Sequence, residues 1–148
     1  MYEHTVNVPL LLVGPGIPRD RLCAAPCYQR DLFPTLCELA SVKVPKIVQG
    51  KSLLPILKGD AESLYSQVVA YFGNVQRMIR AGRWKLIWYP QINKYQLFDL
   101  ANDPNEMKDL SSAPEHAAVL AGLRARLEAW LKENRDPLFT AAASPRAT

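Results

Sequence analysis

The sequence predicts an α/β fold with an α+β main body: one strand of a larger sheet, a helix, a four-stranded antiparallel sheet and a packed carboxy-terminal helix. Three patterns carry this prediction. An apolar run fills residues 6–13, short segments rich in β-branched and aromatic residues lie between residues 67 and 100, and apolar residues recur at helical spacing over residues 120–131.

The first predicted element is a strand over Val6–Val13, whose sequence VNVPLLLV is almost continuously apolar and ends in Gly-Pro-Gly at residues 14–16. A short apolar run that ends in turn residues is typical of a strand buried on both faces of a sheet. Such a strand needs neighbours on both sides, and little sequence precedes it here. We therefore expect that an amino-terminal portion of the fold is missing from this chain.

A helix is predicted over Gln29–Ala40, where apolar residues recur at helical spacing and Pro34 falls in the first turn, the position that tolerates proline. One further helical turn is expected over Ser52–Leu57, because Gly59 follows closely and stops it.

An antiparallel meander is predicted next, because short turn segments separate runs of residues that favour strands. Its four strands are Gln67–Phe72, Gln76–Arg80, Trp84–Tyr89 and Tyr95–Leu100. In the third strand both faces are partly apolar, since Trp84, Leu86 and Trp88 alternate with Lys85, Ile87 and Tyr89.

The last predicted element is a helix that begins with a capping box, Ser112 to Glu115, and carries an apolar stripe that packs on the sheet. The stripe consists of Leu120, Leu123, Leu127, Trp130 and Leu131. We expect residues 1–60 to be the end of a catalytic domain, residues 61–139 to be a carboxy-terminal subdomain, and residues 140–148 to be a disordered tail.

The composition argues against several classes of protein. The net charge is +4, but Lys and Arg are interspersed with acids, so we expect no nucleic-acid partner. No apolar run is long enough to span a bilayer, so we expect no membrane association. Three cysteines, an odd number, argue against a fully paired disulfide framework. The amino terminus does not show a signal-peptide pattern, so the localisation stays open.

Five ordered segments match patterns of one enzyme family. They are Met1–Gly16 (MYE…VPLIV…PG), Gln29–Thr35 (DLFPT), Gln49–Leu57 (GxSLxPLL), Arg77–Ile87 (RxxRxxxxKLI) and Leu97–Leu110 (LYDLxxDPxExxNL). Together they resemble the carboxy-terminal third of the formylglycine-dependent sulfatases, such as arylsulfatases and N-sulfoglucosamine sulfohydrolases of the alkaline-phosphatase-like superfamily. Ser41 departs from the pattern, because the family usually has Gly after this helix.

The resemblance implies a sulfuric ester hydrolase that acts on a sulfated small molecule or glycan. In this family the reaction uses a Ca²⁺ ion and a formylglycine, which is formed within the sequence C-x-P-x-R or S-x-P-x-R. Hard oxygen ligands suit Ca²⁺, and cationic side chains offset the charge of the transferring group. Nearly all of those family residues lie upstream of the segment that matches Met1. We therefore expect a fragment that is inactive alone, with no catalytic residue, metal ligand or cofactor of its own, and with the missing amino-terminal portion as its partner.

Four residues are candidates for the border of a substrate pocket: His4, Tyr71, Asn74 and Arg77. His4 follows the segment that in the family leads from an active-site lysine. Arg77 suits sulfate or carboxylate oxygens, although an ion pair with Asp99 or Glu106 is the favoured interpretation. Arg77 and Arg80 should lie on opposite faces of their strand. Asp99, Asp103 and Glu106 are interpreted as turn residues rather than as a cation site.

The cysteines do not match a formylglycine site, because Pro26 is one position late after Cys23 and no Arg follows at the required spacing. Cys23 and Cys27 are interpreted as small residues of a loop, and Cys37 as a helix residue near the core.

Two alternatives to the sulfatase fragment remain. The chain could be a non-catalytic module that binds a sulfated glycan or a partner protein. It could also be an unrelated binder of anionic surfaces, which its positive charge would favour and which salt-sensitive retention on both heparin and DNA would reveal.

Overall fold

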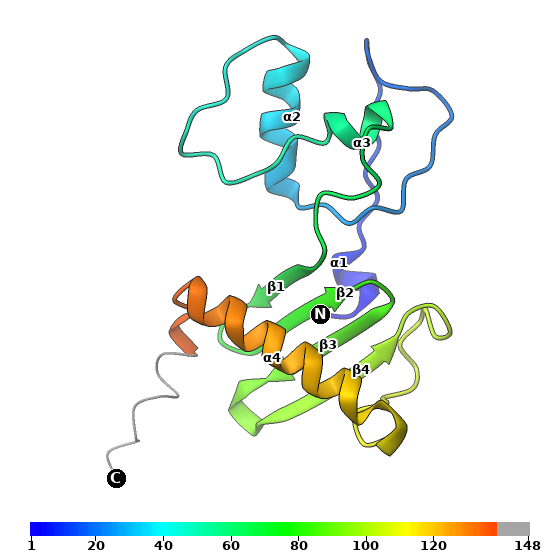
Figure 1. Cartoon of the computed structure of the whole chain (residues 1–148), viewed down its shortest axis with the longest axis vertical. Coiled ribbons are helices and arrows are strands. Elements are labelled where there is room, and N and C mark those ends of the chain that lie inside the picture. Colours follow the sequence, from blue (N-terminus) through cyan, green and yellow to red (C-terminus); the bar gives the residue numbers. More distant parts are fainter. Residues whose placement is uncertain (139–148) are drawn as a thin grey trace. The chain divides into compact units, whose positions relative to one another are not determined.

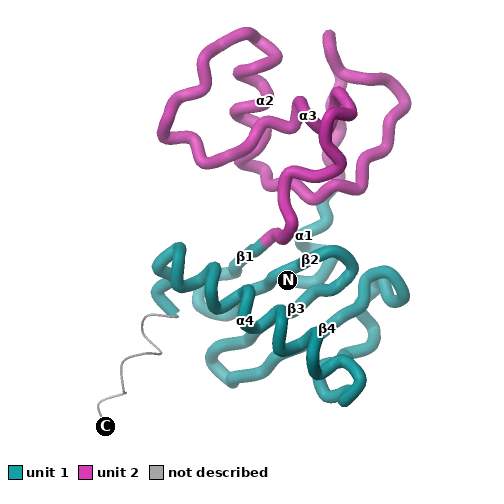
Figure 2. Tube along the Cα trace, in the orientation of Figure 1, with its two compact units in different colours: residues 1–8, 69–148 teal, residues 9–68 magenta. Residues whose placement is uncertain are grey.

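A computed structural model describes residues 1–138 of the chain, so the tail predicted for residues 140–148 lies outside the described residues. The chain divides into two compact units (Figure 2). Unit 1 comprises residues 1–8 together with residues from 69 onwards, and unit 2 comprises residues 9–68.

The centre of unit 1 is a four-stranded antiparallel sheet in the order β1-β2-β3-β4, as the sequence predicts (Figure 1). Its strands are β1 (Val68–Phe72), β2 (Gln76–Ala81), β3 (Trp84–Tyr89) and β4 (Lys94–Asp99). Tight turns join the first three strands, and Gly73 and Gly82 adopt positive φ there. A short 3-10 turn, η2 (Pro90–Ile92), and Asn93 in the left-handed region join β3 to β4.

Helix α4 (Ala117–Glu133) lies across one face of this sheet and follows a 3-10 turn, η3 (Pro114–His116) (Figure 1). The predicted stripe faces the strands: Leu123, Leu127 and Leu131 are buried against Ile79, Leu86 and other residues of the sheet. The predicted capping box at Ser112 is wrong, since the helical turns begin at Pro114 and no side chain caps them. The N-cap residue is Ala113, whose side chain has no oxygen to accept a hydrogen bond from the first N–H groups.

The opposite face of the sheet is covered by the first residues of the chain. A short helix, α1 (Glu3–Val6), follows Met1 and Tyr2, and these residues pack on Met78, Ile87 and Phe98. The alternation of apolar residues on both sides of β3 therefore serves two cores. One core lies under α4 and the other under the amino-terminal segment.

The predicted strand over Val6–Val13 is wrong for this structure. Val6 ends α1, and residues 7–13 form no strand. Four apolar side chains of this segment, Val8, Leu10, Leu11 and Val13, are exposed. The physical reason is that a strand satisfies its backbone groups only through neighbouring strands, and no described segment pairs with this one.

Unit 2 contains η1 (Gln29–Asp31), α2 (Leu32–Leu39) and α3 (Leu54–Lys58), in agreement with the helix and the further turn that the sequence predicts. After α2, Ser41 adopts a φ of 56°, the left-handed conformation that glycine enters at lower cost. Gly59 takes the same role after α3, with a φ of 88°.

Asp31 organises unit 2 from a fully buried position. Its carboxylate accepts hydrogen bonds from the backbone N–H groups of Tyr28 and Lys51 and from the Tyr65 hydroxyl, at 2.7–2.9 Å. The Thr35 hydroxyl donates to the Asp31 carbonyl and accepts from the Leu53 N–H. These partners come from four parts of residues 28–65. Asp31 therefore joins the loops of unit 2 to helix α2.

Two glycine-to-alanine substitutions should act in opposite directions. A Cβ at Gly50 would lie 2.2 Å from the Arg30 carbonyl oxygen, so Gly50→Ala should cost about 1–3 kcal/mol through overpacking. A Cβ at Gly122, inside α4, would meet no atom within 4 Å, so Gly122→Ala should stabilise the protein by about 0.5–1 kcal/mol. Denaturant unfolding followed by circular dichroism measures both, and a neutral Gly50→Ala would contradict the packing described.

Tyr65 should make unit 2 sensitive to alkaline pH. Burial and the Asp31 carboxylate raise the pKa of Tyr65 to about 12, whereas an unfolded tyrosine has a pKa of about 10. The resulting stabilisation is complete below about pH 10 and is lost as the pH rises through about 12. The difference in tyrosinate absorbance between the parent and Tyr65→Phe should therefore titrate near pH 12. A difference titration centred near pH 10 would refute this.

Candidate functional site

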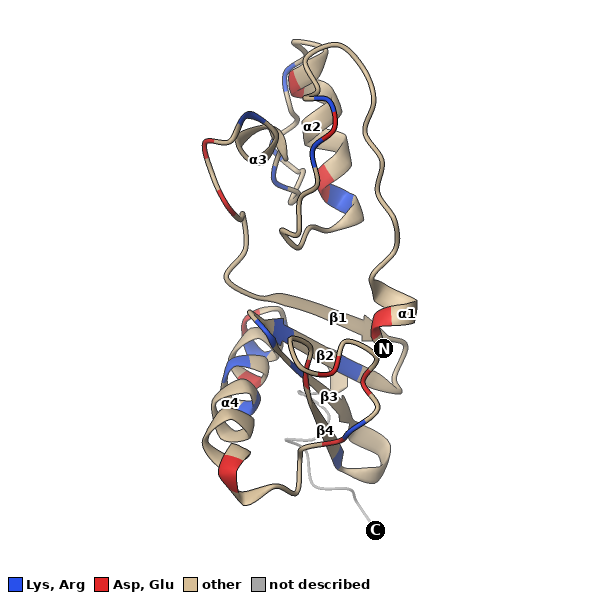
Figure 3. Ribbon diagram, turned by 90° about the vertical axis from the view of Figure 1, so that its right-hand side faces the viewer, with Lys and Arg blue, Asp and Glu red and all other residues tan. Residues whose placement is uncertain are grey.

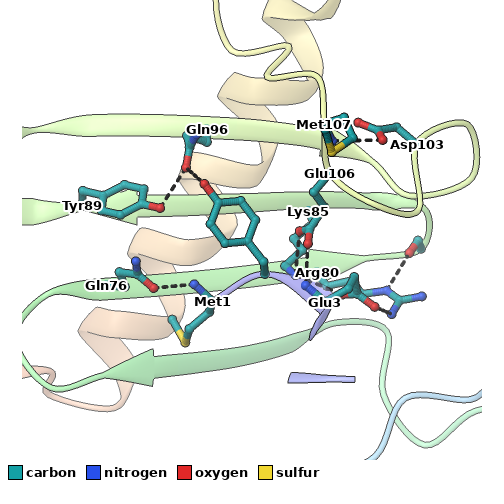
Figure 4. A network of polar contacts seen from close by, with 12 residues as sticks. Met1, Glu3, Gln76, Arg80, Lys85, Tyr89, Gln96, Asp103, Glu106 and Met107 are labelled. Atoms are coloured by element: carbon teal, nitrogen blue, oxygen red, sulfur yellow. Dashed lines mark hydrogen bonds and ion pairs between the residues drawn. The ribbon is translucent and has the colours of Figure 1, made fainter. Parts of the chain in front are cut away.

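A fully buried lysine marks the most unusual chemistry of the molecule. Lys85 lies on β3, and its side chain is directed to the face of the sheet that the amino-terminal segment covers (Figure 4). A buried ammonium group is stable only if charged or polar partners replace its hydration. Here Lys85 Nζ lies 3.0 Å from Glu3 Oε1 and 2.8 Å from Glu106 Oε1.

Two further contacts close this arrangement. Arg80 Nη1 lies 3.3 Å from Glu3 Oε2, and the Glu3 backbone N–H donates to the Glu106 carboxylate. We call Glu3, Arg80, Lys85 and Glu106 the Lys85 network (Figure 4). It joins α1, the two central strands and the loop after β4, and its two carboxylates balance its two cations.

The loop after β4 is built to present Glu106. The Glu106 backbone has a φ of 55°, which costs energy for a residue with a Cβ and persists only where the surroundings hold it. Asp103 provides that support, because its carboxylate accepts the N–H groups of Met107 and Lys108 at 3.0 and 2.8 Å. The Asp103 N–H in turn donates to the Asp99 carbonyl at the end of β4.

The amino-terminal segment is held beside the network by aromatic and amide groups. The Tyr2 hydroxyl donates to Gln96 Oε1 at 2.9 Å, and the Tyr89 hydroxyl donates to the same oxygen at 2.8 Å. The Tyr2 ring meets the Phe98 ring edge-on, with the centroids 5.7 Å apart. Burial, and next the Tyr2 hydroxyl, raise the pKa of Tyr89 well above its usual value.

A hollow of about 320 Å³ lies beside the Lys85 network, within unit 1. It is lined by Glu3, His4 and Asn7 from the amino-terminal segment and by Pro104, Asn105 and Glu106 from the loop after β4. The His4 ring stacks on the Tyr2 ring, with centroids 5.8 Å apart and planes 12° apart. The hollow therefore has two walls, the amino-terminal segment and the loop after β4. The Lys85 network fixes both, because each wall carries one of the carboxylates that Lys85 binds.

The four candidate residues from the sequence do not gather in one place. His4 lines the hollow, whereas Tyr71, Asn74 and Arg77 are not among its lining residues. Arg77 is buried and forms a two-pronged ion pair with Asp136, at 2.8 and 3.1 Å, and its guanidinium lies 5.4 Å from the Tyr71 ring centroid. Asn74 is exposed in the turn between β1 and β2.

Arg77 and Arg80 lie on opposite faces of β2, as their spacing predicts. The acid that pairs with Arg77 is Asp136, beyond α4, and not the predicted Asp99 or Glu106. Asp99 pairs with Arg83, and that guanidinium holds the pKa of the Asp99 carboxyl below its usual value.

Sequence reasoning missed the roles of Glu3, Lys85 and Glu106. Asp99 and Asp103 do accept hydrogen bonds from turn backbone, as expected, but Glu106 is a buried partner of Lys85. One signal could have revealed the network. A lysine between apolar neighbours on a strand with two apolar faces has to be buried, and therefore has to find carboxylates elsewhere in the chain.

The remaining candidates have simpler surroundings. Among residues 1–138, no group of three His, Cys, Asp or Glu side chains could hold a metal ion. Cys23 and Cys27 are exposed thiols and Cys37 is half-buried. Partial loss of hydration, and next the nearby Asp31 carboxylate, raise the pKa of Cys27. No helix in the described part of the chain is long and apolar enough to cross a membrane.

Replacement of Lys85 should test the network. Lys85→Met leaves Glu106 buried without a cation and Glu3 with Arg80 alone, and it should destabilise unit 1 by about 3–5 kcal/mol. Lys94→Met, at an exposed position of β4, is the matched control and should change stability by less than about 0.5 kcal/mol. Both are measured by urea unfolding.

A triple variant separates loss of the ion pairs from loss of packing. Glu3→Gln and Glu106→Gln added to Lys85→Met remove the uncompensated charges, so a large part of the lost stability should return. If the triple variant is no more stable than Lys85→Met, the carboxylates are not the cause of the loss.

Comparison with known proteins identifies the family. Residues 1–133 match the family model "N-sulphoglucosamine sulphohydrolase, C-terminal". A Delta 4,5-hexuronate-2-O-sulfatase of Bacteroides thetaiotaomicron is 34% identical over 91% of this chain and 30% of its own length. The solved structure of a 2-O GAG sulfatase is 35% identical, with a TM-score of 0.62 over 72% of this chain and 25% of that one.

A further solved structure, with D-glucosamine-2-N,6-O-disulfate as bound substrate, is 27% identical, with a TM-score of 0.60 over 73% of this chain and 25% of that one. The chain therefore spans no more than about a third of the length of these relatives. It belongs to the sulfatases, and it corresponds to their carboxy-terminal part.

Proposed function

We propose that this chain is the carboxy-terminal portion of a sulfuric ester hydrolase, that it completes the fold and borders the substrate pocket, and that it does not turn over substrate alone. The observation that carries this proposal is the exposed apolar segment at residues 8–13. Leu11 is 84% exposed and Val13 is 86% exposed. Neighbouring apolar residues that are left exposed are typical of an interaction site, and here the expected occupant is the amino-terminal portion of the enzyme.

We propose that the two portions of the enzyme divide the chemistry between them. In the family pattern nearly all the residues that hold Ca²⁺ and form the formylglycine lie upstream of the segment that matches Met1, so we assign both to the amino-terminal portion. Unit 1 would contribute the rigid pocket border. The Lys85 network fixes Glu3, and with it His4 and Asn7, in one position relative to the loop after β4.

Sulfated saccharides are the substrate class we propose. One relative is a hexuronate-2-O-sulfatase, and another binds a disulfated glucosamine as its substrate. In a complete enzyme, cationic groups of the amino-terminal portion would neutralise the sulfate, while polar side chains of this chain would contact the rest of the ligand.

A chimeric enzyme tests this proposal. This chain replaces the matching carboxy-terminal segment of the Bacteroides hexuronate-2-O-sulfatase, in a host that converts the nucleophile to formylglycine. The chimera should hydrolyse an aryl sulfate in the presence of Ca²⁺, whereas the 148-residue chain alone should not. Turnover by the chain alone would refute the proposal.

The apolar segment gives a sharper comparison within the chimera. Leu11→Asp should place an unpaired charge in a buried interface, at a cost of about 3 kcal/mol or more, and lower the yield of active enzyme about a hundredfold. Ile92→Asp, at another exposed apolar residue, is the control and should leave the yield unchanged. An active Leu11→Asp chimera would show that residues 8–13 are not part of the interface.

A further inference from the structure

The hollow beside the Lys85 network presents hydrogen-bonding groups that the fold does not use. His4, Asn7 and Asn105 all line the hollow and are exposed, and within residues 1–138 their side chains form no hydrogen bond with another residue. Amide side chains both donate and accept, and imidazole does the same in its neutral form. A ligand with several hydroxyl groups could therefore satisfy all three at once.

The charges around the hollow disfavour an ionic ligand. Its two acidic residues, Glu3 and Glu106, are bound to Lys85 and Arg80, so they are not available as ligands for a cation. The same pairing uses both cations, so no unpaired cation lines the hollow to attract an anion. The charges of the Lys85 network therefore sum to zero, and a ligand in the hollow would be recognised through hydrogen bonds.

The size and rigidity of the hollow suit one ring-sized group. Its volume of about 320 Å³ lies at the small end of the range for ligand pockets. Pro104 adds an apolar wall beside the polar groups. Both walls are fixed before any ligand arrives, because Lys85 binds a carboxylate in each, and preorganisation of this kind reduces the entropy lost on binding.

We propose that His4, Asn7 and Asn105 form a subsite for an uncharged sugar ring. Their side chains would form hydrogen bonds with the hydroxyl groups of the ring. The subsite would hold a neutral part of a saccharide substrate and not its sulfate group. The role of this subsite in catalysis rests on the proposed sulfatase function, but sugar binding can be measured separately.

Histidine NMR on the chain provides the measurement. The chain has two histidines, His4 and His116, so a His116→Gln variant assigns both imidazole Cε1–H resonances. The probes are N,N′-diacetylchitobiose, which is neutral, and inorganic sulfate. Chitobiose should shift the His4 resonance saturably, with little dependence on salt between 50 and 200 mM, and leave His116 unmoved. Sulfate should shift neither resonance.

Matched asparagine variants locate the subsite. Asn105→Ala and Asn7→Ala should each weaken chitobiose binding about threefold to tenfold, which corresponds to one hydrogen bond. Asn74→Ala makes the same chemical change in the turn between β1 and β2 and should leave the affinity unchanged. Absence of a saturable His4 shift with chitobiose, or equal loss in Asn74→Ala, overturns the proposal, as does a salt-sensitive response to sulfate.

The same titration in the chimera decides the result if the chain alone gives poorly dispersed spectra. There Asn105→Ala should raise KM for a saccharide sulfate about threefold to tenfold and leave aryl sulfate turnover unchanged. A chimera that turns over aryl sulfate but shows no His4 response refutes the subsite and not the sulfatase function. A chimera that shows the His4 response but no turnover refutes the sulfatase function and not the subsite.

Discussion

The buried ammonium group of Lys85 is the constraint on which unit 1 depends. A charge that is removed from water must be compensated nearby, and Lys85 finds its two carboxylates in α1 and in the loop after β4. Neither segment is regular sheet, and neither would be held there by strand pairing. The lysine therefore determines where the amino-terminal segment lies, at a cost in desolvation that the ion pairs and the Glu3 N–H offset.

Apolar packing and this ionic contact act on the same face of the sheet. Met78, Ile87 and Phe98 form a small core with Met1, and Tyr2 covers its edge. Apolar contacts are not directional, so on their own they would allow the short segment to slide. The charged groups have fixed partners and define the register. The larger core beneath α4 needs no such device, because a long helix presents a continuous stripe.

The sequence was informative wherever structure follows from local pattern. The four strands, α2 and the stripe of α4 are formed by residues close together in the chain, and their spacing predicted them. The pairing of Lys85 with Glu3 joins residues 82 positions apart, and that of Arg77 with Asp136 joins residues 59 apart. No periodicity encodes such contacts. The strand prediction over residues 6–13 was wrong for a related reason. Whether an apolar segment forms a central strand depends on the strands beside it and not on its own sequence alone.

The residues that line the hollow fall into two physical classes, and this separation supports a binding role. Glu3 and Glu106 are fixed by ion pairs, so the fold depends on them. His4, Asn7 and Asn105 are exposed and form no side-chain hydrogen bonds among the described residues, so the fold does not depend on their polar groups. Their replacement should therefore cost little stability. Rigid walls that carry unused donors and acceptors are what recognition of a hydroxylated ligand requires, because the entropy of ordering those walls is already lost on folding.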